Sequence, residues 1–201
     1  MRGDLEYQAP ERIGEALAAA LGPRTGLDVL ELGCGTGLAA PVLRPYARRL
    51  TGIDLSPEMV EKARAGGRYD TLEVAEITAW LARDATTFDL VVACDTLIYF
   101  GDLRQITVPV ASRLRPSGVL VFTVERDAGE AFRLTDSGRY AHSLTHVQAA
   151  VDAAGLQLEH VSEGLLRYEY GAAVTGLVVT ARRPDRKSTR LNSSHVALSR
   201  M

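Results

Sequence analysis

The stretch Val29–Gly37, which reads VLELGCGTG, decides the fold class of this chain. Its first four residues are mostly apolar, as in a buried strand, and three glycines then alternate with other residues. A buried strand that runs directly into a glycine-rich turn usually places a cofactor on that turn. Several classes of cofactor are held in this way, so the spacing of the glycines has to discriminate among them.

Three classes of cofactor are commonly held on such a turn, namely dinucleotides, nucleoside triphosphates and S-adenosylmethionine. The spacing of the glycines argues against the first two classes. A dinucleotide turn carries glycines at its first, third and sixth positions, but the sixth position here is Leu38. A nucleoside triphosphate loop ends in Gly-Lys-Ser/Thr, and this stretch has no lysine. S-adenosylmethionine remains. It carries no phosphate but needs an acceptor for its positively charged amino group, which Glu31 supplies, and glycines let the backbone approach it closely.

Strand-like apolar runs alternate with amphipathic helical patterns along most of the chain. The strand candidates span 27–32, 49–55, 71–76, 88–94 and 118–125. The helix candidates span 37–47, 57–65, 77–83, 103–114 and 143–154. This alternation predicts right-handed crossovers and an α/β, Rossmann-like, doubly wound sheet. Two further apolar runs after Leu156 have no helix between them, and they predict a hairpin that gives the sheet an antiparallel edge.

Polar groups follow the successive predicted strands, at the edge where open α/β sheets bind ligands. Asp54 follows the second strand, at a spacing that suits an acceptor for both ribose hydroxyls. After the third strand, Glu76 offers a carboxylate to an exocyclic adenine amine, and Ile77 offers its amide to a ring nitrogen. Asp95, Thr96 and Tyr99 follow the fourth strand. The sequence therefore predicts that these groups meet at one rim.

Four motifs together resemble those of the class I S-adenosylmethionine-dependent methyltransferases. They are Glu31–Gly37, the helix start Gly52–Pro57, Phe88–Val92 and Leu114–Gly118. The resemblance covers about residues 27–182, and it implies S-adenosylmethionine as cofactor and a seven-stranded, mostly parallel sheet with an antiparallel last strand. The cofactor-binding positions that it implies are Glu31, Gly33, Cys34, Gly35, Gly37, Asp54, Leu55, Glu76, Ile77 and Asp95. The family more often has Asp after the third strand, so Glu76 is a longer substitute.

A narrower resemblance is to the methyltransferase domain of bacterial methyltransferases that carry tetratricopeptide repeats. It rests on residues 137–156, SGRYAHSLTHVQAAVDAAGL, and on residues 165–171, LLRYEYG. In that group a Y-x-x-P segment, here Tyr7–Pro10, opens the methyltransferase domain. We therefore expect this chain to begin near the start of the domain, without the repeats.

Methyl transfer from a sulfonium depends mainly on alignment of the reacting atoms, and an oxygen or nitrogen acceptor also has to lose a proton. His142 is the first candidate for the general base and Asp95 the second. Tyr99, Arg139 and Tyr140 are candidate substrate contacts, because the polar segment GRYAHS could close over the substrate. The alternatives are that this segment is only a turn before a helix cap, that Asp95 only shapes the rim and that Tyr99 belongs to the core.

Two further patterns have alternative interpretations. The four-residue step from His142 to His146 resembles a helical metal pair, but no third ligand follows at metal spacing, so we expect no metal. Arg167 and Glu169 alternate along a predicted strand and share one face. They form either a surface pair or part of the pocket.

The composition is that of a single globular domain. The 201 residues are 46% hydrophobic and 24% charged, with a net charge of −2, so a nucleic-acid partner is not expected. No apolar run approaches the roughly 20 residues of a membrane span, and no signal peptide is recognisable. The two cysteines, Cys34 and Cys94, suit free thiols in a reducing compartment. We therefore expect a cytoplasmic protein.

The last seventeen residues, Asp185–Met201, differ from the rest of the chain. They lack apolar periodicity and resemble the translation of a common sequencing adapter, so we expect a methyltransferase domain at 1–184 and an adapter-derived or disordered tail at 185–201. The sequence predicts an S-adenosylmethionine-dependent methyltransferase that acts on an unidentified small molecule. The alternatives are a protein methyltransferase and a cofactor-binding module without turnover, and Leu38 disfavours a nicotinamide oxidoreductase.

Overall fold

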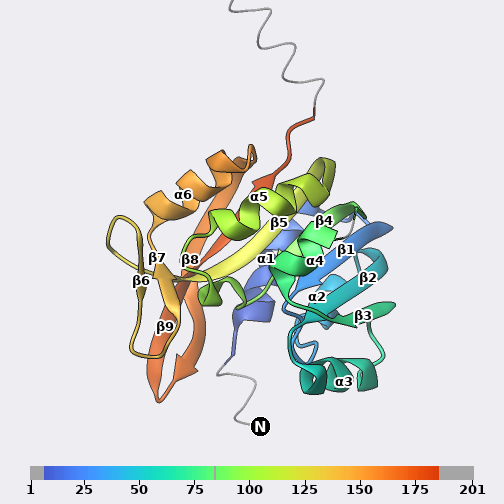
Figure 1. Ribbon diagram of the computed structural model, residues 1–201, viewed down its shortest axis with the longest axis horizontal. Helices are drawn as coiled ribbons and strands as arrows, with labels where there is room; N and C mark the ends of the chain where they lie inside the picture. The colour runs from blue at the N-terminus through green and yellow to red at the C-terminus, as the bar shows by residue number, and fades with distance from the viewer. Residues whose placement is uncertain (1–6, 84, 186–201) are drawn as a thin grey trace, which may run out of the picture.

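The first five strands form the parallel part of the sheet in the computed structural model, which describes residues 7–83 and 85–185 (Figure 1). They are β1 (Leu27–Leu32), β2 (Ala47–Asp54), β3 (Thr71–Val74), β4 (Phe88–Ala93) and β5 (Leu114–Arg126). Their spatial order is β3-β2-β1-β4-β5, and every neighbouring pair is parallel. All of β1 is buried, because helices cover both of its faces. The predicted tail lies, apart from Asp185, outside the described residues.

Helices cover the two faces of the sheet and bury a separate apolar cluster on each. They are α1 (Ala9–Leu21), α2 (Ala40–Leu43), α3 (Pro57–Ala65), α4 (Ile77–Arg83), α5 (Arg104–Arg113) and α6 (Leu144–Ala153), with a short 3₁₀ helix, η1 (Leu97–Tyr99). Residues of α4, α5 and α6 share one cluster, and residues of α1 and α2 share the other. No helix within the described ranges is long and apolar enough to cross a membrane.

The predicted helix boundaries agree closely with the structure except at α2. The helix expected over 37–47 is only Ala40–Leu43. Gly37 has a φ of +85°, which no right-handed helix contains. Pro45 has no N–H to continue the helical hydrogen bonds. The glycine-rich turn is therefore longer than the periodicity indicated.

The C-terminal hairpin confirms the predicted antiparallel edge. It consists of β8 (Gln157–Glu169) and β9 (Ala172–Arg182), and β9 also pairs antiparallel with the Val119–Glu125 part of β5. Tyr170 and Gly171 form the two-residue turn, with φ values of +49° and +80°. Positive φ at both turn residues is typical of the tight turns that match the twist of a hairpin.

Within the described residues, two three-residue strands extend the sheet from the expected seven strands to nine. They are β6 (Phe132–Leu134) and β7 (Tyr140–His142), an antiparallel pair in which β7 also lies parallel to the end of β5. Runs of three residues are too short to carry a readable period, so the sequence did not reveal them. The Ser143 side chain then accepts a hydrogen bond from the His146 N–H at 3.0 Å and caps α6.

Candidate active site

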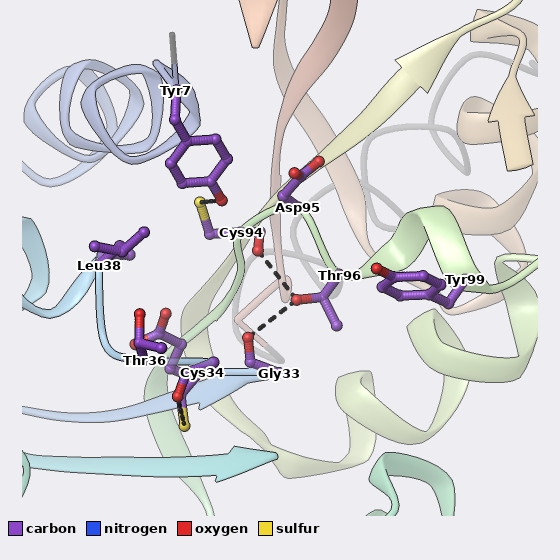
Figure 2. Close-up of a pocket in the computed structure, with 12 residues that line it drawn as sticks. Tyr7, Gly33, Cys34, Thr36, Leu38, Cys94, Asp95, Thr96 and Tyr99 are labelled. Atoms are coloured by element: carbon purple, nitrogen blue, oxygen red, sulfur yellow. Dashed lines mark hydrogen bonds between the residues drawn. The ribbon is translucent and has the colours of Figure 1, made fainter. Parts of the chain in front are cut away.

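Two adjoining cavities lie at the carboxyl ends of the parallel strands. The first, the glycine-turn cavity, has a volume of about 250 Å³, and the second, the Asp54 cavity, about 310 Å³. The glycine-turn cavity is lined by Tyr7, Glu31, Gly33, Cys34, Gly35, Thr36, Leu38, Ala39, Cys94, Asp95, Thr96 and Tyr99 (Figure 2). The Asp54 cavity is lined by Asp54, Leu55, Glu76, Ile77, Thr96, Tyr99 and Phe100. The two cavities therefore share Thr96 and Tyr99.

The backbone of the glycine turn needs glycine for two different reasons. Gly33, Gly35 and Gly37 all have positive φ, at +66°, +52° and +85°. At Gly33 a Cβ would also lie 2.4 Å from the Cγ2 of Thr96. Thr96 is held there because its hydroxyl lies 3.3 Å from the carbonyl oxygen of Gly33 and 3.1 Å from that of Cys94. The turn and the end of β4 are thus packed directly against each other.

Asp54 fixes the glycine turn from the end of β2. Its Oδ2 accepts a hydrogen bond from the Gly35 N–H at 2.8 Å, and its Oδ1 accepts one from the Ser56 N–H at 2.9 Å. Each carboxylate oxygen has a second lone pair, so both can still accept from a ligand hydroxyl. Leu55, which is 70% exposed, lies beside it on the wall of the Asp54 cavity.

Glu31 is enclosed at the base of the glycine-turn cavity. Glu31 is 1% exposed, and its Oε2 accepts a hydrogen bond from the Tyr69 hydroxyl at 2.7 Å. Burial raises the pKa of Glu31 to about 8, although the Tyr69 hydrogen bond acts in the opposite direction. A cation in the cavity would favour the ionised form of this carboxyl.

Glu76 reaches the Asp54 cavity, but its carboxylate turns to the start of α4. It accepts hydrogen bonds from the Thr78 N–H at 3.0 Å and the Ala79 N–H at 2.7 Å. Burial acts to raise the pKa of Glu76, but hydrogen bonds from the Thr78 hydroxyl and from these backbone N–H groups outweigh it and lower the pKa. Its oxygens therefore cap the helix, and Oε1, which accepts from the Thr78 N–H alone, keeps a lone pair for the predicted contact with an adenine amine. Ile77 is buried and lines the same cavity, and the contact of its amide with a ring nitrogen stays a prediction.

Asp95 follows β4 and lies between Tyr7 and Tyr99 at the rim of the glycine-turn cavity (Figure 2). Its φ is +54°, a conformation that non-glycine residues adopt rarely. The Thr123 hydroxyl accepts a hydrogen bond from the Asp95 N–H at 2.8 Å. Its Oδ1 lies 2.6 Å from the Nη1 of Arg167. Burial raises the pKa of Asp95, and the charge of Arg167 opposes that rise.

His142 is fully buried, which corrects the prediction that it is the general base. Its Nε2 lies 2.8 Å from the carbonyl oxygen of Phe100. Because a carbonyl oxygen only accepts, Nε2 carries the proton, and Nδ1 has no partner in the described part of the chain. Burial lowers the pKa of this imidazole. The enclosed ring fastens β7 to the loop after η1 and does not reach either cavity.

The other two predicted substrate residues of the GRYAHS segment have different surroundings, and their contact with a substrate stays a prediction; Arg139 lies against Tyr99, which lines both cavities. Tyr140 is half-buried and packs edge-on against Phe132, with ring centroids 5.8 Å apart, and it is not among the described residues that line the cavities. The Nη1 of Arg139 lies 2.5 Å from the carboxylate of Glu169. Tyr99 is 63% exposed and lines both cavities, so it belongs to the site and not to the core.

The sequence analysis did not predict five of the residues that line the glycine-turn cavity, which are Tyr7, Thr36, Leu38, Ala39 and Cys94. Cys94 directly precedes Asp95, and its position at the end of a strand was the available signal. Tyr7 precedes α1 and reaches the cavity from the other side, with its hydroxyl 3.9 Å from the Sγ of Cys94. Cys34 is buried, and this burial raises its pKa to about 12, so the thiol fills space and is not a nucleophile.

Comparison with known proteins identifies similar domains. Residues 30–122 match the family model described as "Methyltransferase domain". The chain is 32% identical over 168 residues to a ubiquinone biosynthesis O-methyltransferase of Xanthomonas axonopodis pv. citri, a match that covers 74% of this chain and 70% of that protein. It is 33% identical over 121 residues to nodulation protein S of Rhizobium tropici, but that match covers 56% of this chain and 48% of the relative. The chain thus spans about half the length of this second relative.

A solved structure extends the similarity to the whole fold. The N-methyltransferase NodS from Bradyrhizobium japonicum WM9, in complex with S-adenosyl-L-homocysteine, superposes with a TM-score of 0.70. The sequence identity is 25%, and the match covers 87% of each chain. The arrangement of helices around the sheet is therefore shared over most of the described residues.

Proposed function

The chain belongs to the class I S-adenosylmethionine-dependent methyltransferases, and from this premise we propose that it transfers a methyl group from S-adenosylmethionine to a small-molecule acceptor. The observation that carries the proposal is the hydrogen bond between Asp54 and the Gly35 N–H. This hydrogen bond joins the walls of the two cavities. A ligand that extends across both cavities therefore meets the Asp54 carboxylate near the middle of the ligand. S-adenosylmethionine has its ribose in that place, between a methionine part and an adenine.

The residues present fit this cofactor. A Cβ at Gly35 would meet no protein atom within 4 Å, so the backbone there faces open space. Asp54 would hold the ribose hydroxyls, Leu55 and Ile77 would flank the adenine, and Glu31 would accept from the amino group. The combined size of the cavities is that of a small-molecule site, about 300–1,000 Å³. When bound, S-adenosylmethionine supplies a methyl group that its sulfonium makes electrophilic.

The protein contributes alignment and the removal of a proton. Tyr99 borders both cavities and would orient the acceptor toward the methyl group. Asp95 lines the glycine-turn cavity and is the proposed general base for an oxygen or nitrogen acceptor. Its raised pKa, which burial causes, makes the carboxylate a stronger base than an exposed aspartate. His142, which is buried, has no part in this proposal.

The names of the relatives support a small-molecule acceptor. The similar proteins include an O-methyltransferase of ubiquinone biosynthesis and an N-methyltransferase. Within the family, we place this chain with the methyltransferases that carry tetratricopeptide repeats, on the strength of the GRYAHS and LLRYEYG segments. We also propose that residues 1–184 form the methyltransferase domain and that 185–201 are a tail. Neither the group within the family nor the domain boundary changes the proposed reaction.

Calorimetry and label transfer together test the proposed function. S-adenosylmethionine, S-adenosylhomocysteine and NADH are titrated into the chain and into Asp54→Ala, with Asp152→Ala, an exposed acid of α6, as the matched control. We expect micromolar binding of the first two ligands, which only Asp54→Ala loses, and no binding of NADH. S-adenosylmethionine with a labelled methyl group is then incubated with bacterial extract, and the label is expected in the small-molecule fraction.

Each other result contradicts a distinct part of the proposal. Binding of NADH alone would identify a nicotinamide site. Label in the protein fraction would make the chain a protein methyltransferase. Binding of S-adenosylmethionine without transfer to any fraction would leave a cofactor-binding module without turnover.

A further inference from the structure

Arg167 lies buried among three carboxylates that come from three different strands or strand ends. It is on β8, and the residue is 7% exposed. Its Nη1 lies 2.6 Å from the Oδ1 of Asp95, which follows β4. Its Nη2 pairs with Glu125 of β5 and lies 3.5 Å from the Oε2 of Glu169. The sequence left open whether Arg167 belongs to the surface, and the structure places it inside.

The guanidinium is held rigidly in this position. Glu125 is 8% exposed, so its pair with Arg167 is shielded from water. The planar fork of arginine matches carboxylates in fixed directions, which a lysine cannot do. The adjacent residue Leu166 also accepts a backbone hydrogen bond from the Gln8 N–H at 2.7 Å, which anchors this part of β8 to the segment before α1.

One end of the cluster reaches the glycine-turn cavity through Asp95. Its N–H is fixed by the Thr123 hydroxyl, and its Oδ1 by Arg167. No hydrogen bond from the described residues reaches Oδ2, although the residue lines the cavity. Backbone of positive φ persists at a non-glycine residue only where the surroundings fix it, and such residues gather at functional sites.

We propose that Arg167 is a positioning residue, which holds Oδ1 of Asp95 so that Oδ2 is presented to the nucleophilic atom of the methyl acceptor. Glu125 holds the other terminal nitrogen of the guanidinium, Nη2. This inference rests on the proposed function, since it names a residue that acts on the acceptor through Asp95. Arg167 itself touches neither the cofactor nor the acceptor.

The charges around Asp95 give the proposal a measurable signature. Arg167 and Arg139 favour its ionised form, whereas burial and the charge of Glu125 disfavour it. The uncharged Tyr7 and Cys94 lie on the cavity side. Removal of the Arg167 charge should therefore raise the pKa of Asp95, and removal of the Glu125 charge should lower it. A purely structural ion cluster would show the same two shifts, so the pH profile of methyl transfer to bacterial extract is measured beside them. Its acid limb should follow the pKa of Asp95 only if Asp95 takes the proton of the acceptor.

The test is a carbon-13 NMR titration of the aspartate carboxyl groups in the full chain. The Asp95 resonance is identified by its loss in Asp95→Asn, and it is followed with pH in the wild type, Arg167→Gln, Arg167→Lys and Glu125→Gln. Arg126→Gln is the matched control, because Arg126 of β5 pairs with Glu163 of β8 outside the cluster. We expect a higher pKa in Arg167→Gln, an intermediate one in Arg167→Lys, a lower one in Glu125→Gln and no change in Arg126→Gln.

The proposal is overturned if Asp95 titrates at the same pH in the wild type and Arg167→Gln, or if Arg167→Gln and Glu125→Gln shift its pKa in the same direction. Should Arg167→Gln fail to fold, Arg167→Lys decides, because it keeps the charge but not the planar fork: a pKa of Asp95 and a pH profile of methyl transfer equal to those of the wild type overturn the proposal. A parallel titration of the wild type with S-adenosylhomocysteine tests the proposed function separately. Absence of binding there contradicts the proposed function whatever the NMR result.

Discussion

The backbone N–H of Gly35 donates a 2.8 Å hydrogen bond to the Oδ2 of Asp54, nineteen residues further along the chain. The bond links the turn after β1 to the end of β2. The other oxygen of Asp54 accepts from the Ser56 N–H at 2.9 Å and so fixes the start of α3. A single carboxylate therefore shapes the glycine turn and also faces the cavity in which we place the ribose.

Asp54→Asn should separate these two roles. The amide keeps one oxygen for a backbone N–H but loses the negative charge and the second acceptor. Hydrogen bonds to charged groups are worth about 1.5–3 kcal/mol, so we expect S-adenosylhomocysteine to bind roughly 10- to 100-fold more weakly. Thermal unfolding should show a loss of stability of about 1–2 kcal/mol. An unchanged affinity, measured by calorimetry beside Asp152→Asn, would show that Asp54 does not contact the ligand.

Gly33→Ala and Gly35→Ala form a matched pair for the glycine turn. Both residues have positive φ, which costs an alanine about 1–2 kcal/mol. Only at Gly33 does the new Cβ also meet Thr96, at 2.4 Å, and overpacking costs roughly 1–3 kcal/mol more. We therefore expect Gly33→Ala to unfold at lower urea concentration than Gly35→Ala. Equal midpoints would contradict the close packing of the turn against Thr96.

Glu31→Gln should change how stability depends on pH. Burial raises the pKa of Glu31 from 4.5 to about 8 in the folded chain. Between these values the folded chain keeps a proton that the unfolded chain has released, so stability falls as the pH rises through this window. The glutamine does not titrate. We expect the wild type to lose stability relative to Glu31→Gln by roughly 1.4 kcal/mol for each pH unit inside the window.

Tyr69→Phe is the companion variant for Glu31. The Tyr69 hydroxyl donates to Glu31, and this hydrogen bond lowers the pKa of the carboxyl against the larger effect of burial. Its removal should extend the window of falling stability to higher pH. Urea unfolding of the three proteins at several pH values measures both effects. Parallel curves for the wild type and Glu31→Gln would contradict the raised pKa.

The parallel sheet and the rim of its cofactor site could be predicted because they depend on local patterns. Alternating periods identified the strands and helices, and the ends of parallel strands necessarily meet at one edge. The ion cluster around Arg167 could not be predicted, because its partner Asp95 lies 72 residues away and a charged residue in a strand is usually exposed. The strands β6 and β7 left no periodic signal for a different reason, because three residues are too few to show a period.

His142 shows where the interpretation of a polar segment fails. A histidine between polar neighbours was expected at the surface of the pocket, but β7 turns its ring inward, where it is fully buried. Neither the residue types nor their spacing indicates which side of such a short strand faces the interior. Its neighbour Arg139, on the same segment, does approach the site through Glu169.

His142→Gln is therefore expected to affect acid stability and not the chemical step. Burial lowers the pKa of His142 in the folded chain, with a smaller contribution from the neighbouring His146, so the unfolded chain binds protons more readily. The stability that this residue contributes is present above its ordinary pKa of 6.5 and is lost as the pH falls below it.

Glutamine in place of His142 still offers an N–H to the Phe100 carbonyl but does not titrate. Urea unfolding between about pH 5 and 7.5 should show a shallower acid loss in His142→Gln than in the wild type. Methyl transfer that disappears in His142→Gln while the folded fraction stays constant would restore His142 as the general base.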